Sequence, residues 1–351
     1  MEWNIRDAWV KNSRGERVID FQRSNLHVVG YSRPVRTRLS LAQLKGRLFT
    51  LPEHPDWIPY RTTYYTDEWG FCLTHREFLA LEEDEYEVCV DASFEPGHLT
   101  YGECLLPGET DEEVLVSSHI CHPSLGNDNL SGVVIAAFLG RHLAARPRRY
   151  TYRLLFAPGT IGAITWLALN ESGLGRIAHG LVLTCLGDAG PLHYKKSRRG
   201  NATIDRAMRH LLAARGGAHA ILDFSPTGYD ERQYGSPGLD LPVGRLTRTL
   251  PGRFPEYHTS GDDLDLVRPT ALADSFAVCL ELFELLEENR TYLSQNPKGE
   301  PQLGRRGLYH SVGGRPQEPE ELAMLWVLNL ADGRHTLLDI AERASLPWFE
   351  Q

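Results

Sequence analysis

The sequence predicts an α/β protein whose main domain is built on a largely parallel sheet with helices on both faces. Three observations lead to this class. Continuous apolar runs recur between residues 113 and 186, helical segments alternate with them, and one long helical segment follows. Because ligands of such sheets usually bind beyond the carboxyl ends of the strands, the polar residues that directly follow a strand are of most interest.

The central segment alternates strands with helices in a regular order. Buried strands are expected at EVLVSS, YTYRLLFA and GLVLTCL, which cover residues 113–118, 150–157 and 180–186. Helices are expected at 130–143, 164–171, 203–215 and 269–289. The last helix repeats apolar residues at helical spacing, so we expect it to pack on the sheet.

A β-rich part precedes this unit, and a helical tail follows it. Short strands separated by Gly, Pro and Asp clusters are expected at 18–21, 26–29, 47–51, 86–91 and 98–106. The aromatic stretch PDWIPYRTTYYTDEWGF suits a core or an interdomain contact, and the wall of a substrate cleft is the alternative. At the other end, a Gly-, Pro- and Arg-rich linker over 291–318 leads to two short amphipathic helices joined at Asp332-Gly333.

Charge and composition argue against some function classes. The 351 residues carry a formal net charge of -9 at pH 7, whereas nucleic-acid binding needs clustered Lys and Arg. The densest basic stretch, KKSRR at 195–199, suits a solvated loop, and the anion-binding edge of a substrate cleft is the alternative. The tail has a helix-turn-helix outline but is not basic, so we expect packing or oligomerisation from it rather than DNA binding.

Cysteine usage and the N-terminus indicate a location. Six cysteines are dispersed without a Cys-x-x-Cys pair, which suits free thiols in a reducing compartment. The first residues hold no apolar stretch of signal-peptide length, and no run of about 18 apolar residues occurs in the chain. We therefore expect a cytoplasmic protein.

One stretch carries candidate metal ligands. SSHICHPSLGNDNLSG, residues 117–132, follows the first buried strand and precedes a helix. Capping of that helix by Asp128 or Asn129 is the structural alternative. Capping does not explain why His119 ends the strand or why His122 follows it in a turn. Imidazole and carboxylate are ligands that zinc and similar divalent ions take, so the stretch predicts a metal site.

A second stretch supports the first. FPEYHTSGDDLDLV, residues 254–267, places His258 just before the long helix, with several carboxylates close behind it. Histidine ligands are often oriented by a carboxylate that accepts their second ring N–H. A loop histidine bonded to Asp262 or Asp263 for local order is the alternative.

These motifs, in this order, resemble a known family. Strand, His, Asp-Asn-x-Ser-Gly, helix and a distant His-Thr-x-x-Asp are similar to the zinc aminopeptidase and transferrin-receptor-like hydrolases of the phosphorylase/hydrolase-like fold. Five stretches more closely resemble bacterial aminopeptidase-like proteins that carry an inserted β-domain and a C-terminal winged-helix-like segment: SSHICHPSLGNDNLSG, APGTIGAITWLALNE, KKSRRGNATIDRA, FSPTGYDERQYGSPG and FPEYHTSGDDLD. The resemblance implies a three-layer α/β/α aminopeptidase-like domain with a mostly parallel mixed sheet.

The resemblance also implies domain boundaries. Residues 1–30 are expected to form the N-terminal part of the aminopeptidase-like domain, 31–110 the β-rich inserted domain, 111–295 the main α/β domain, and 296–351 the linker and a truncated winged-helix-like segment. Because we expect the chain to be shorter than such relatives at both ends, a homo-oligomer is left open.

Carried over by residue, the resemblance implies a zinc site. His119, Asp128 and His258 match metal ligands, with Asp128 in the place of the aspartate that bridges two zinc ions. One ion is expected, and two are the alternative. The remaining predicted contacts are to substrate, from His122, Tyr229 and Tyr257; His122 alternatively orders its turn.

The sequence departs from the family at the catalytic base. Where such aminopeptidases carry adjacent glutamates, one the general base and one a zinc ligand, this chain has Gly159 and Thr160, and a further aspartate ligand falls near Thr184. Three ligands still suit one ion with an open position. The candidate replacement carboxylates are Asp188, Glu231 and Glu256, of which Asp188 and Glu231 are the predicted catalytic residues.

Together these patterns predict a metal-dependent hydrolase of the aminopeptidase-like class. Metal-activated water would cleave an aminoacyl, peptidyl or N-acyl amide in a small molecule or peptide. The alternative, motivated by the missing glutamates, is a catalytically inactive binding or scaffold protein of a biosynthetic pathway. We expect neither a nucleic-acid nor a membrane partner.

Overall fold

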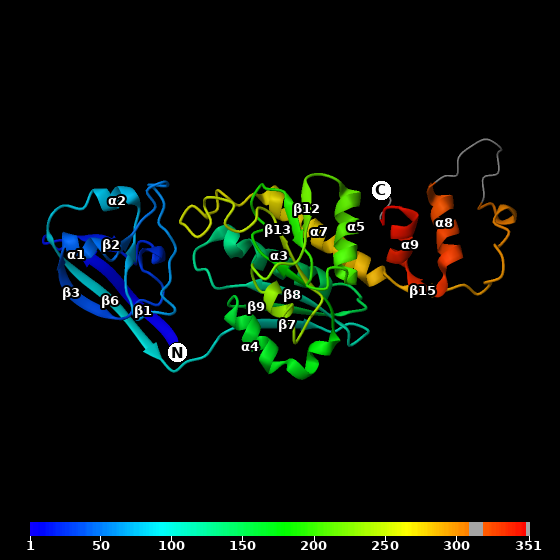
Figure 1. The fold of residues 1–351 in the computed structure, drawn as a ribbon, viewed down its shortest axis with the longest axis horizontal. Helices are drawn as coiled ribbons and strands as arrows, with labels where there is room; N and C mark the ends of the chain where they lie inside the picture. Colours follow the sequence, from blue (N-terminus) through cyan, green and yellow to red (C-terminus); the bar gives the residue numbers. More distant parts are fainter. Residues whose placement is uncertain (309–318, 349–351) are drawn as a thin grey trace.

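The computed structural model describes residues 1–308 and 319–348, so the linker prediction over 309–318 and the last three residues of the tail lie outside the described residues. Three parts follow one another along the long axis of the molecule: a β domain, a central α/β domain and a small C-terminal unit (Figure 1). Within the described residues, no helix is long and apolar enough to cross a membrane. All six cysteines are free.

The N-terminal part is an antiparallel β domain, blue and cyan in Figure 1. Its sheet has the strand order β2-β1-β6-β3, and buried residues alternate with more exposed ones along β6, as expected for a sheet with one face on a core. Its elements are β1 (Glu2–Lys11), β2 (Arg17–Asp20), η1 (Asn25–His27), β3 (Val35–Ser40), α1 (Leu41–Lys45), β4 (Leu48–Phe49), β5 (Phe71–Cys72), α2 (His75–Leu79) and β6 (Glu85–Glu95).

The predicted boundaries of this domain are wrong at both ends. Residues 1–30 belong to the β domain, because β1 pairs with β6 over nearly its whole length. At the other end, β7 (Gly102–Leu106) pairs with β9 of the central sheet, so the α/β domain begins before residue 111. Neither pairing is visible locally, because each joins strands that are far apart in the sequence.

The central domain contains a seven-stranded mixed sheet with the order β12-β11-β13-β10-β8-β9-β7. The neighbours β13, β10, β8 and β9 are parallel, whereas β7 and β11 run antiparallel to β9 and β13. The mostly parallel mixed sheet is therefore confirmed. Its strands after β7 are β8 (Glu113–His119), β9 (Thr151–Ala157), β10 (Ile177–Leu183), β11 (Leu192–Lys195), β12 (His219–Leu222) and β13 (Val243–Thr247).

Helices cover both faces of this sheet and confirm three layers. Val114 and Val116 of β8 pack in one core cluster with α3, α5 and α7, while Leu115 between them packs in another cluster with α4. This division follows from the alternation of side chains along a strand. The helices are η2 (Gly126–Ser131), α3 (Gly132–Ala144), α4 (Ile161–Leu169), η3 (Glu171–Arg176), α5 (Thr203–Arg215), α6 (Glu231–Tyr234) and α7 (Pro269–Glu288).

The C-terminal unit packs on the central domain. Arg206 of α5 forms ion pairs with Asp339 and Glu342 of α9, which agrees with the packing role expected for the tail. The turn predicted between its two helices is instead the strand β15, which pairs with β14. The elements are β14 (Thr291–Leu293), η4 (Gly304–Arg306), α8 (Pro319–Leu330), β15 (Asp332–Thr336) and α9 (Leu337–Ala344).

Residues 58–60 of the β domain form hydrogen bonds through their backbone with the loop before α7, at the carboxyl edge of the central sheet. Ile58 N–H donates to Ser260 Oγ at 2.9 Å, and Ser260 N–H donates back to Ile58 O at 2.8 Å. Tyr60 N–H donates to His258 O at 2.8 Å. The β domain therefore holds the loop that carries the predicted ligand His258.

Ser260→Ala is expected to lower the free energy of unfolding by about 1–3 kcal/mol, because the buried Ile58 N–H loses its acceptor. Urea titration measures the change. Ser172→Ala, at an exposed serine of η3, is the matched control and should stay within about 0.5 kcal/mol of the parent protein. Equal stability of the two variants would contradict the prediction.

Candidate metal centre

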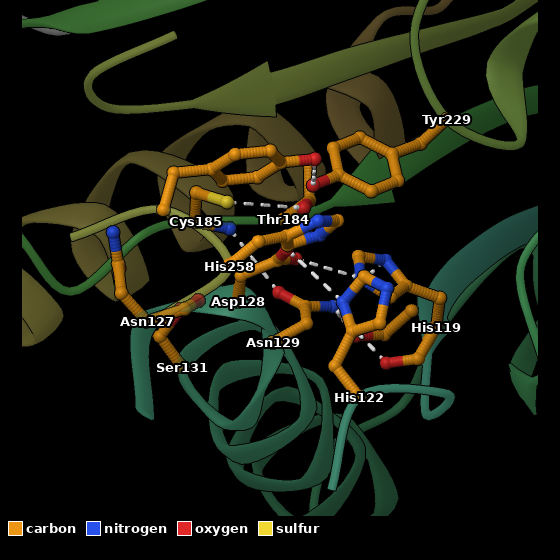
Figure 2. Close-up of polar contacts among 12 residues, drawn as sticks. His119, His122, Asn127, Asp128, Asn129, Ser131, Thr184, Cys185, Tyr229 and His258 are labelled. Carbon is orange, nitrogen blue, oxygen red and sulfur yellow. Dashed lines mark hydrogen bonds and ion pairs between the residues drawn. The ribbon is translucent and has the colours of Figure 1, made fainter. Parts of the chain in front are cut away.

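The three predicted ligands meet at the carboxyl edge of the sheet (Figure 2). His119 is the last residue of β8, Asp128 lies in η2, and His258 lies in the loop before α7. Asp128 is fully buried and stands among three imidazoles. Its Oδ1 lies 2.8 Å from His119 Nε2, and its Oδ2 lies 3.2 Å from His258 Nε2 and 3.0 Å from His122 Nδ1.

The ligand atoms of His122, Asp128 and His258 converge on a common space. They lie within 4.8 Å of one another, and the described residues hold a second such group in His119, Cys121 and His122. In the first group, His122 Nδ1, Asp128 Oδ2 and His258 Nε2 have no partner with hydrogen-bond geometry within residues 1–308 and 319–348. Donors about 2.0–2.1 Å from a tetrahedral zinc ion lie roughly 3.3 Å apart, so these atoms fit such an ion.

His122 belongs to both groups of potential ligands, which the sequence did not suggest. The two roles that we expected of it, ordering its turn or contacting substrate, stay predictions. Its HxxH spacing from His119 was the signal that could have identified it. His119, Asp128 and His258 are brought together as expected, and their role as metal ligands stays a prediction.

Aromatic rings hold the imidazoles from outside. Tyr229 stacks on His119 with ring centroids 4.4 Å apart, and Tyr257 stacks on His258 at 4.0 Å. The two hydroxyl groups are 3.0 Å from each other. Tyr229 and Tyr257 therefore lie beside the candidate centre, as predicted, and fix the planes of two of its rings. Their contact with substrate stays a prediction.

A third tyrosine ring comes from the β domain. The Tyr60 ring meets His122 and His258 edge-on, with centroids 5.4 Å from each. The aromatic stretch thus supplies the expected interdomain contact, because Tyr60 belongs to it and borders the imidazoles. A role as the wall of a substrate cleft stays a prediction.

Hydrogen bonds to the backbone fix the loop that carries Asp128. The side chains of Asn127, Asn129 and Ser131 accept the N–H groups of Gly187, Cys185 and Leu186 at 2.8–3.1 Å. Helix α3 has no side-chain cap, so the capping role considered for Asp128 and Asn129 is wrong. The polar residues of GNDNLSG instead join η2 to the segment that follows β10.

Asp262 fixes the same loop from the other side. Its carboxylate accepts the N–H groups of Asn127 and Asp128, and its own carbonyl accepts Gly126 N–H. The loop alternative for His258, a bond to Asp262, is therefore not what the structure has. Asp262 instead connects the His258 loop to the Asp128 loop.

Burial and neighbouring charge set the protonation of the centre. Burial acts to raise the pKa of Asp128, but the three imidazoles outweigh it and hold that pKa well below its usual range. Burial likewise acts to lower the pKa of His122, but Asp128 and Cys121 outweigh it and raise the pKa of His122 to about 10. Burial lowers the pKa of His119, against the effect of Asp128. In the absence of an ion, a protonated His122 therefore balances the negative charge of Asp128.

The predicted catalytic carboxylates have other partners. Asp188 accepts hydrogen bonds from Gly190 N–H, Asn127 Nδ2 and Thr249 Oγ1. Glu231 Oε1 lies 2.8 Å from Lys195 Nζ and 3.1 Å from Arg245 Nη1. These contacts favour structural roles for both, and the prediction that one replaces the missing base stays untested.

Sequence reasoning missed a third carboxylate, Asp230. It is 1% exposed, and its Oδ1 has no hydrogen-bond partner in the part of the chain that the structure describes. A Cβ placed on Gly159 would lie 3.5 Å from that oxygen and 3.2 Å from His119 Cβ. Burial and then the Glu231 charge raise the pKa of Asp230 to about 7. The carboxylate thus faces the position where the family glutamate is absent.

The comparisons with known proteins agree with this architecture. A family model described as a domain of unknown function, DUF4910, matches residues 1–289. The chain belongs to the DUF4910 family. A winged helix-turn-helix model matches residues 290–350, which confirms the predicted C-terminal segment of this DUF4910 protein.

Two relatives come from Clostridium acetobutylicum. One protein is 50% identical over 346 residues, covering 98% of the DUF4910 chain and 80% of its own length, and is provisionally named a polysaccharide biosynthesis protein with an aminopeptidase-like domain. A crystal structure, provisionally described as a peptidase, has a TM-score of 0.92 at 49% identity and covers 98% of this chain and 79% of that chain.

A zinc aminopeptidase from Bacillus subtilis shares the fold. Its TM-score is 0.58 at 12% identity, and the match covers 84% of this chain and 85% of that one. The expected aminopeptidase-like fold is therefore confirmed, and at this identity the likeness concerns the fold alone.

Metal binding is expected to release about one proton at neutral pH, because an ion must displace the proton that the raised pKa keeps on His122. Affinity for zinc should accordingly increase as the pH rises. Titration calorimetry in buffers of different ionisation enthalpy measures the release. His122→Gln should reduce it, and binding without proton release would refute this account.

Proposed function

We propose that this DUF4910 protein is a metal-dependent amide hydrolase of the aminopeptidase-like class. The observation that carries the proposal is the convergence of His122 Nδ1, Asp128 Oδ2 and His258 Nε2, all without hydrogen-bond partners of their own among the described residues. Asp128 Oδ2 lies 3.0 Å from His122 Nδ1 and 3.2 Å from His258 Nε2 without hydrogen-bond geometry, so the three atoms contact one another and would also suit an ion as their common partner. Imidazole and carboxylate donors select zinc or a similar divalent ion.

The centre lies where such chemistry is expected, at the carboxyl edge of a parallel sheet and at the contact between two domains. When bound, zinc lowers the pKa of a water molecule to about 7 and polarises a carbonyl group. Asp128 holds the surrounding imidazoles in place, and the rings of Tyr229, Tyr257 and Tyr60 contact them.

Asp230 is the residue that we propose as the general base. Its carboxylate faces Gly159 beside His119, and a base works best when its pKa is near the operating pH. In this assignment Asp230 takes the role of the glutamate that is absent at Gly159. Asp188 and Glu231 are not needed as the base, and their carboxylates are already paired.

The substrate is a small amide, aminoacyl or N-acyl. The provisional name of the Clostridium relative points to polysaccharide biosynthesis, so we propose that the amide belongs to a saccharide precursor. Inactive scaffold proteins need no convergent ligand atoms, which is why we favour an enzyme over that alternative.

Asp128→Asn is expected to remove the bound zinc and to reduce amide hydrolysis at least about 100-fold, because it removes the charge that three imidazoles surround. Metal analysis of protein purified without chelator and assays on aminoacyl and N-acetyl substrates measure both effects. Asp265→Asn, at an exposed carboxylate in the loop that carries His258, is the control. A parent protein without metal and without metal-stimulated activity would sink the proposal.

Asp230→Asn is expected to lower kcat about 10²- to 10⁴-fold while the zinc content is unchanged. The sign of the pH effect follows from the raised pKa: below about pH 7 the carboxyl group is protonated and cannot accept a proton. The parent protein should therefore lose activity as the pH falls through 7, and the variant should lack this limb. A variant with the parent pH profile would show that Asp230 is not the base.

A further inference from the structure

A polar cavity adjoins the candidate metal centre. It has a volume of about 600 Å³, and its wall includes Tyr229 and Tyr257, the rings that stack on His119 and His258. The cavity and the two imidazoles therefore share Tyr229 and Tyr257 as neighbours. The cavity also contains Lys195, Arg245 and Arg253 in its lining.

Two buried cations lie opposite each other on neighbouring strands of the sheet. Lys195 of β11 and Arg245 of β13 are direct partners in the antiparallel register of these strands, and they are 3% and 5% exposed. Like charges that are opposed and buried destabilise a sheet unless an anion lies between them. Glu231 is that anion, since its Oε1 bonds both.

One carboxylate does not balance two cations. The cluster of Lys195, Arg245 and Glu231 carries an excess positive charge, and Arg245 Nε has no hydrogen-bond partner within the described residues. Desolvation lowers the pKa of Lys195 in spite of Glu231, and Arg245 adds to this effect. The buried cluster therefore holds one carboxylate, Glu231, for two cations.

A further cation at the rim of the cavity adds to this positive charge. Arg253 is exposed there, and no ion pair to it is found among the residues that the structure describes. The carboxylate in the lining, Asp223, lies 2.6 Å from Lys196 Nζ and is thus already paired. Fields of one sign in a concave site concentrate ligands of the opposite sign.

The backbone passes close to the cluster at Gly228, a residue in the lining of the cavity. A Cβ at this position would lie 2.3 Å from Glu231 Oε1 and 2.6 Å from Arg245 Nη1, and the residue has φ +129. Only glycine can pass so close to the paired charges in this conformation. The sequence thus leaves no side chain between the cluster and the cavity at this point.

We propose that the cavity binds an oxyanion of the substrate, a carboxylate or a phosphate, beside the amide that is cleaved. The inference deepens the proposed function and rests on it, because it takes the bound molecule to be the substrate of that reaction. The anion site itself is argued only from the residues in and around the cavity. Guanidinium and ammonium groups in low dielectric favour such groups through charge-assisted hydrogen bonds. The basic stretch KKSRR begins at Lys195, so its alternative interpretation as an anion-binding edge is the one that we adopt.

The test uses inorganic phosphate and glutarate, which have no scissile bond, with the full-length protein. Titration calorimetry should detect saturable binding of at least one of them, and their relative affinity distinguishes a phosphate site from a carboxylate site. Arg253→Glu is expected to weaken binding at least about fivefold. Arg334→Glu, the same charge change at an exposed arginine of β15, is the matched control and should have no effect.

Two further variants separate this site from its neighbours. Glu231→Gln removes the carboxylate that competes for Lys195 and Arg245, so it should strengthen anion binding, an effect that loss of folding cannot imitate. Asp128→Asn should retain the binding, whereas an anion held by a metal ion would be lost with it.

Absence of binding, or equal binding by the parent protein and Arg253→Glu, would overturn the anion site. Retained anion binding without any amide hydrolysis would instead refute the proposed function alone. The two proposals therefore fail in different ways.

Discussion

The buried carboxylate of Asp128 is the interaction on which the rest of the centre depends. A negative charge without solvent costs several kcal/mol unless opposite charge or hydrogen bonds compensate it. Here the compensation comes from three imidazoles that lie on three segments: His119 at the end of β8, His122 in the turn after it, and His258 before α7. These segments are thereby drawn to one point at the edge of the sheet.

The frame around this carboxylate is built largely from backbone hydrogen bonds. Asp262 accepts the N–H groups of the Asp128 loop, while Asn127 accepts from the segment after β10. The β domain completes the frame through Tyr60, whose N–H bonds His258 O and whose ring borders two imidazoles. Such a frame keeps ligand geometry constant while leaving the ligand atoms free for an ion.

Two neighbouring residues at the start of α6 belong to different electrostatic environments. Asp230 faces Gly159 beside the imidazoles without a partner for its Oδ1 among the described residues, whereas Glu231 turns to Lys195 and Arg245. Tyr229, directly before them, lies between the two environments. An amide at the candidate metal centre and an anionic group in the cavity would therefore both lie next to Tyr229.

The sequence by itself determined the alternation of strands and helices in the central domain and pointed to the candidate ligands His119, Asp128 and His258, because the period of apolar residues and the residues at strand ends are local properties. Only the tertiary structure decided that β1 joins the first sheet, that His122 turns toward Asp128 and that Asp230 faces Gly159. The physical reason is that these contacts depend on strand order and on the paths of loops. Both are set by packing between distant segments, which a local pattern does not record.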